Sequence, residues 1–130
     1  MAKFKVVTLR SSNDVQSGSK LNYDSEMEAL SPIGAEIIEG TIDSEEGFLN
    51  QAKDADAIIA TYGKITKSMV NGLNSCKIIA STGVGTDGVD VEAATIRGIH
   101  VTNVTDTFIE EVADQSMALN LSTFRKIITL

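Results

Sequence analysis

The 130-residue sequence predicts an α/β fold in which helices cover a parallel sheet. Short runs of apolar and β-branched residues alternate along the chain with segments of helical periodicity, and no repeat or low-complexity tract interrupts them. The run AIIAT at 57–61 is apolar enough to be buried on both faces, which is typical of strands in parallel sheets. Five strand–helix units in succession therefore indicate a doubly wound sheet.

The predicted strands cover residues 3–9, 35–39, 57–61, 77–81 and 100–103. A long polar loop follows the first of them. The first helix begins at a capping box formed by Ser25 and Glu28, and it closes at Pro32 and Gly34. This first unit leads directly into the second strand.

The remaining helices have start and stop signals of their own. Asp43 begins a second helix, and Thr66 caps a third. The fourth helix spans 91–97, with Gly98 in the place of a C-terminal cap. Short crossovers of this kind favour the flavodoxin-like strand order 2-1-3-4-5, in which ligands bind outside the carboxyl ends of the strands.

With 42% hydrophobic and 22% charged residues, the chain has room for one domain with one core. Its net charge of −7 and isoelectric point near 4.6 argue against binding nucleic acid or an anionic membrane surface. Because Cys76 is the only cysteine, no intrachain disulfide can form, and its apolar neighbours predict a core position. No cluster has metal-ligand spacing, and the absence of an apolar leader predicts a cytoplasmic protein.

The stretch STGVGTDGVDVEA follows the fourth predicted strand. Gly83 to Gly88 reads G-x-G-x-x-G, a spacing typical of dinucleotide-binding turns, and Asp106 follows 18 residues later, where a ribose-binding acid is expected. However, Asp90 is the better N-cap of the next helix, and with Asp87 it places negative charge where a pyrophosphate would sit. The turn also follows the fourth strand rather than the strand that opens a nucleotide-binding half.

Two other interpretations of these glycines stay open. They allow the backbone to adopt positive φ in a tight turn and do nothing more. Alternatively, the free backbone N–H groups of Val84 and Gly85 form a nest that binds a small carboxylate. The carboxylate interpretation is favoured, because two N–H groups can hold its oxygens without a basic side chain.

Three segments together resemble a known family: ADAIIATYGKIT, KIIASTGVGTDGVDVEAATIRGIHVTN and FIEEVADQSMALNLSTFRK. They are similar to the N-terminal part of the D-isomer-specific 2-hydroxyacid dehydrogenases, over roughly Ala55 to Lys126. The resemblance implies a two-domain, NAD-dependent enzyme in which this domain closes over a small 2-oxo or 2-hydroxy carboxylate. In that family the loop matching Gly83, Val84 and Gly85 presents backbone N–H groups to the substrate carboxylate.

The resemblance also places Tyr62 and Gly63 on the neighbouring loop of the cleft, where Tyr62 either shapes the substrate's side-chain end or packs over the loop. It places every catalytic group in later sequence, so we expect this chain alone to be inactive. NAD or NADP would serve the whole enzyme, with none bound to this piece. Ile109 stands where the family approaches the cofactor, whereas His100 is interpreted as structural.

Residues 1–104 form the predicted flavodoxin-like domain, and 105–130 a bridging helix that would begin a truncated nucleotide-binding domain. Apolar residues recur at helical spacing over roughly 30 Å of this helix: Ile109, Ala113, Met117, Leu121, Phe124 and Ile128. We expect the helix from Thr107 to Ile128 to form a homodimer. Folding back over the sheet is the alternative.

Two other functions stay open. The segment EEVAD resembles the branch that includes the C-terminal-binding-protein corepressors, which suggests an NAD-regulated module that docks partner peptides. The segment Ser17 to Ser19 follows the first strand, where flavodoxin-like FMN carriers hold a phosphate. The chain has no tryptophan and only 2 tyrosines with which to sandwich a flavin, which argues against the carrier.

Overall fold

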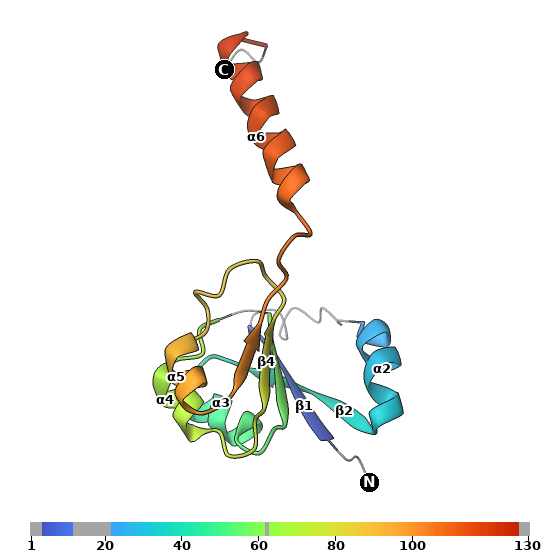
Figure 1. Ribbon diagram of the computed structural model, residues 1–130, viewed down its shortest axis with the longest axis vertical. Helices are drawn as coiled ribbons and strands as arrows, with labels where there is room; N and C mark the ends of the chain where they lie inside the picture. Colours follow the sequence, from blue (N-terminus) through green and yellow to red (C-terminus); the bar gives the residue numbers. More distant parts are fainter. Residues whose placement is uncertain (1–3, 12–21, 62, 128–130) are drawn as a thin grey trace.

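The computed structural model describes residues 4–11, 22–61 and 63–127. Its centre is a parallel sheet in the order β2-β1-β3-β4-β5, which confirms the predicted order (Figure 1). The strands are β1 (Phe4–Arg10), β2 (Ala35–Thr41), β3 (Ala57–Ala60), β4 (Ile78–Ser81) and β5 (His100–Thr102). After β2 the chain crosses over β1 and adds β3 on its other side, followed by β4. The carboxyl ends of β1, β3 and β4 are therefore neighbours along one edge of the sheet.

The helices are α2 (Asp24–Leu30), the short 3-10 helix η1 (Ser31–Ile33), α3 (Glu45–Ala52), α4 (Lys67–Gly72), α5 (Val91–Ile96) and α6 (Ile109–Phe124). Figure 1 shows α3, α4 and α5 grouped together beside the sheet, whereas α2 lies apart from them, next to β2. None of the helices in the described part of the chain is long and apolar enough to cross a membrane.

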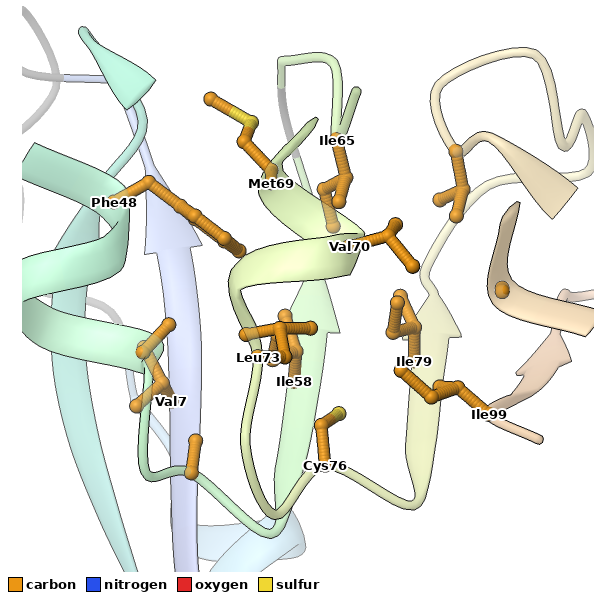
Figure 2. Packing of buried hydrophobic residues seen from close by; sticks show 14 of the residues in the cluster. Val7, Phe48, Ile58, Ile65, Met69, Val70, Leu73, Cys76, Ile79 and Ile99 are labelled. Carbon is orange, nitrogen blue, oxygen red and sulfur yellow. The ribbon is translucent and has the colours of Figure 1, made fainter. Parts of the chain in front are cut away.

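The core lies between the sheet and the group α3, α4 and α5. Phe48, Val70 and Leu73 from the helical layer meet Ile58 and Ile79 from the strands, and all are at most 1% exposed (Figure 2). Cys76 belongs to the same cluster, which confirms its predicted core position. Burial raises the pKa of its thiol, so the uncharged form is favoured.

Polar groups gather on the opposite face of β1. Strand side chains alternate between faces, so Thr8 points away from the core that receives Val7. Its Oγ1 lies 3.2 Å from the phenolic oxygen of Tyr23, which directly precedes α2. Arg10 follows on the same face, almost fully buried, and its guanidinium lies 3.5 Å from a carboxylate oxygen of Glu39 on β2.

Two predicted helix starts are wrong. The first helix begins at Asp24 after Tyr23, so Ser25 lies inside it and forms no capping box. The next helix is capped by Ser44 rather than Asp43, because extended Ser44 lets its Oγ accept from the Gly47 N–H at 3.0 Å.

Other predicted boundaries are confirmed. Thr66 caps α4 by accepting from the Met69 N–H. Gly34 and Gly98 close their units at φ of 73° and 68°, values that glycine adopts without a steric penalty.

The last helix is shorter than the predicted range of Thr107 to Ile128. It ends in a Schellman motif, in which Lys126 adopts a φ of 53° while its N–H bonds the Thr123 carbonyl and the Ile127 N–H bonds the Ser122 carbonyl. Ile128 lies outside the described residues. α6 has no buried residue and extends away from the sheet rather than folding back over it (Figure 1).

Candidate functional site

Two loops meet at the carboxyl ends of β3 and β4, where the sequence predicts the ligand site. The Ile65 N–H donates to the Gly88 carbonyl at 2.7 Å, and the Asp90 N–H donates to the Ile65 carbonyl at 3.0 Å. An isolated parallel bridge between Ile65 and Val89 joins the same loops. These bonds hold the two loops against each other and fix their relative position.

A cavity of about 290 Å³ opens between the loops. Its described lining residues are Ala60, Thr61, Gly63, Ser81, Gly83, Gly85, Gly88 and Val89. It therefore brings together Gly63, Gly83 and Gly85, three of the residues that the sequence assigns to the substrate. Of the other two, Val84 lines an adjoining cavity, and Tyr62 lies outside the described residues. None of the described lining residues is charged, so any anion held here is held by backbone or hydroxyl groups.

The glycines of this turn do not serve to allow positive φ. Among the described glycines, only Gly34, Gly63 and Gly98 have positive φ, so that interpretation is wrong for Gly83, Gly85 and Gly88. A Cβ atom built on Gly83 would lie 3.9 Å from its nearest neighbour, and one on Gly85 would lie 3.8 Å away. Neither the backbone nor the packing of this chain requires glycine at 83 or 85, which leaves room for a ligand to approach the backbone.

Five consecutive amides of the turn, Val84 to Gly88, donate no hydrogen bond within the described part of the chain. They include the N–H groups of Val84 and Gly85. The carbonyls beside them are held: the Gly83 oxygen accepts from the Val104 N–H at 3.1 Å, and the Val84 oxygen accepts from Asn103 Nδ2 at 2.6 Å. The turn thus presents free donors on one side and satisfied acceptors on the other.

The described residues do not fit the pyrophosphate of a dinucleotide. α5 begins at Val91, beyond the last glycine of the motif, and Asp90 Oδ1 accepts from the Ala93 N–H at 2.8 Å. The positive end of the helix is therefore already occupied by a carboxylate, and Asp87 adds an exposed acid beside Gly85. A phosphate would meet both charges.

A second, apolar cavity of about 440 Å³ adjoins the turn. It is lined by Val84, Phe108, Ile109, Val112 and Ala113, so Ile109 lies across from the glycine turn at the start of α6. Its side chain is 61% exposed, and its surroundings are hydrocarbon. Ile109 offers contact area here and no hydrogen bond.

Other residues singled out in the sequence lie away from the cavity. His100 is exposed at the amino end of β5, opposite the edge that holds the site. Glu110 and Glu111 lie in the first turn of α6, where the helix dipole stabilises them. No group of three metal-ligating side chains occurs among the described residues.

The sequence interpretation missed Asn103. The sequence predicts it only as the end of a strand, whereas its amide reaches across to the glycine turn, 19 residues earlier. An asparagine directly after a strand, at the edge where ligand binding is predicted, was the available signal. Its partner could not be known before the register of β5 against β4 was known.

Comparison with known proteins identifies the family. Residues 21–123 match the family model described as D-isomer specific 2-hydroxyacid dehydrogenase, catalytic domain. The chain is 39% identical over 85 residues to D-3-phosphoglycerate dehydrogenase of Methanocaldococcus jannaschii, covering 65% of this chain and 16% of that protein. It is 37% identical over 84 residues to glyoxylate reductase of Pyrococcus furiosus, covering 64% of this chain and 25% of that protein.

A solved structure gives the same result. The NAD+-bound 3-phosphoglycerate dehydrogenase of Entamoeba histolytica superimposes with a TM-score of 0.71 at 26% identity, covering 96% of this chain and 40% of that one. The chain thus spans well under half the length of the relatives it matches. Because the family model covers most of its residues, the chain belongs to the D-isomer specific 2-hydroxyacid dehydrogenase family.

Proposed function

We propose that this chain is the substrate-binding part of an NAD-dependent 2-hydroxyacid dehydrogenase and that it holds the carboxylate of a small 2-hydroxy or 2-oxo acid. The observation that supports this most is the pair of unpartnered N–H groups at Val84 and Gly85, in a turn whose glycines leave space for a ligand. Two preorganised donors suit two carboxylate oxygens. The rest of the acid would extend into the cavity toward Gly63, Thr61 and Ser81.

In the whole protein, the reaction would be a reversible hydride transfer between a nicotinamide cofactor, NAD or NADP, and the carbinol carbon of the acid. Residues 1–104 would bind and orient the acid, and 105–130 would lead into a nucleotide-binding domain. The activities named for the relatives, reduction of glyoxylate and oxidation of phosphoglycerate, support a small 2-hydroxy or 2-oxo acid as the ligand. The described residues would contribute binding and exclusion of water, with no catalytic group among them.

We further propose that α6 forms a homodimer with its twin. The helix exposes Ile109, Met117, Leu121 and Phe124 at 54–81% of their surface, and none of its residues is buried in the described part of the chain. An exposed apolar stripe on a helix that projects away from its own sheet is stabilised by a partner (Figure 1).

Titration with sodium glyoxylate tests the carboxylate site. In two-dimensional NMR, the amide signals of Val84 and Gly85 should shift with glyoxylate and pyruvate, and they should shift more than they do with NAD. Val84→Pro removes one donor and should weaken glyoxylate binding about tenfold or more, because a charge-assisted hydrogen bond contributes roughly 1.5–3 kcal/mol. Val84→Ala keeps the N–H and is the matched control.

Three outcomes would contradict the proposal. A stronger response to NAD than to glyoxylate would mean that the turn binds the dinucleotide. No response to any of the acids would favour the corepressor-like module, whose ligands are peptides. A flavin absorption band that persists through dialysis would instead support an FMN carrier, whose predicted phosphate loop, Ser17 to Ser19, lies outside the described residues.

The 130-residue chain should not oxidise NADH in the presence of glyoxylate, pyruvate or hydroxypyruvate. The reason is that the described residues lining the cavity include no histidine, carboxylate or lysine that could serve as a general acid or base. Absorbance at the NADH band should therefore fall no faster than in a protein-free blank. Loss of NADH that scales with protein concentration, and that Val84→Pro abolishes, would show that the chain holds its own acid–base group.

A further inference from the structure

We infer that Asn103 is a positioning residue for the proposed carboxylate site: its side-chain amide holds the Val84 carbonyl so that the Gly85 N–H faces the cavity. The inference rests on the proposed function for the identity of the ligand. Its geometry is independent of that function, because it concerns only how one peptide unit is oriented. No other described residue hydrogen-bonds the Val84 carbonyl.

The orientation follows from the planarity of the peptide unit. All described peptide bonds are trans, so each N–H points opposite to the carbonyl that precedes it. The Val84 carbonyl accepts from Asn103 Nδ2 at 2.6 Å, which turns the Gly85 N–H away from the segment after β5. The Gly83 carbonyl accepts from the Val104 N–H at 3.1 Å, which does the same for the Val84 N–H.

The two donors therefore depend on different anchors. The Val84 N–H is oriented by the backbone N–H of Val104, which a substitution at Asn103 leaves in place, whereas the Gly85 N–H is oriented by a side chain. Gly85 also has the wider range of backbone conformations, since it lacks a Cβ atom. Loss of the Asn103 amide would leave the Val84–Gly85 peptide free to rotate, while the Val84 N–H keeps its direction.

Asn103 lies in a partly exposed position. Its hydrogen bond can therefore orient the Gly85 N–H without contributing much to the stability of the fold. A hydrogen bond that water can replace contributes little to the free energy of unfolding. The same bond matters more for binding, because an unoriented donor must be ordered when the ligand arrives. If Asn103 had a purely structural role, its substitution would instead change the unfolding midpoint and would not affect the Gly85 N–H differently from the Val84 N–H.

The test uses the 130-residue chain with Asn103→Ala and Asn103→Asp. Asn74→Ala is the matched control, since the Asn74 side-chain amide also makes one exposed hydrogen bond, to Asp54 at 2.9 Å. Residual dipolar couplings of the Val84 and Gly85 N–H groups report their directions without ligand. Sodium glyoxylate is then titrated while both amide signals are followed, and the urea midpoint is measured for each variant.

We expect Asn103→Ala to change the Gly85 N–H direction, to leave the Val84 N–H direction unchanged and to weaken glyoxylate binding about tenfold. Asn103→Asp should weaken binding further, because its carboxylate cannot donate and would repel both the carbonyl and the ligand. Asn74→Ala should match the unsubstituted chain in every measurement.

Two results would overturn the inference. The first is an unchanged Gly85 N–H direction in Asn103→Ala, whether or not any acid binds. The second is a glyoxylate affinity in Asn103→Ala equal to that of the unsubstituted chain. If the unsubstituted chain itself does not respond to glyoxylate, the proposed function fails, and the Gly85 N–H direction alone decides whether Asn103 orients the peptide.

Discussion

Light scattering should give a dimer mass for the 130-residue chain, and Leu121→Asp combined with Phe124→Asp should shift that mass to a monomer. These side chains are 54% and 81% exposed on α6. Burying each against a twin would contribute about 1.5–3 kcal/mol before the ordering costs of association are subtracted. Two buried carboxylates would be charged and unpaired, so the interface should not form.

A matched control places the same charges elsewhere on the helix. Gln115→Asp combined with Ser122→Asp adds two carboxylates on the side of α6 opposite the apolar stripe, and it should leave the dimer intact. A monomer mass for the unsubstituted chain at high concentration would refute the dimer. If hydrogen exchange then showed α6 protected, the helix would fold back in solution, unlike its extended placement in Figure 1.

Phe48→Ala should lower the free energy of unfolding by about 3–5 kcal/mol, the usual cost of deleting a fully buried phenylalanine. Phe48 is 0% exposed and joins α3 to the core cluster (Figure 2). Small domains have about 5–15 kcal/mol of stability in total, so this loss would leave part of the chain unfolded at 37 °C. Urea unfolding followed by circular dichroism measures it, at one fixed protein concentration because dimerisation would contribute.

Phe108→Ala is the control for the same chemical change at the surface. Phe108 is 52% exposed, beside the apolar cavity, so its truncation should cost about 0.5 kcal/mol or less. Equal losses for the two variants would mean that Phe48 does not pack in the core, or that Phe108 is covered in solution by a partner. Repeating the comparison with the Leu121→Asp, Phe124→Asp chain separates those causes.

Most of the fold could be predicted from local pattern. The run at 57–61 is apolar throughout, and Thr66 and Gly98 are unambiguous boundary residues, so the elements and their order were predictable. The errors fell at helix ends: neighbouring residues of similar capping chemistry compete at two helix starts, and α6 ends at Phe124, earlier than predicted. Ser44 rather than Asp43 caps α3 because the backbone is extended at Ser44, and backbone conformation at one residue is not encoded in residue type alone.

The candidate site, too, has features that the sequence predicts and features that only the structure shows. The G-x-G-x-x-G spacing and its acidic neighbours were enough to predict a ligand-binding turn after the fourth strand and to argue against a pyrophosphate, because both predictions depend on residues close in sequence. The sequence alone also determined the strand order, since apolar periodicity and short crossovers leave few topologies. Only the tertiary structure decided that Gly63 and Gly85 line one cavity and that Asn103 reaches Val84. Those contacts join separate strands, and their geometry depends on the register between strands, which no single segment of the chain carries.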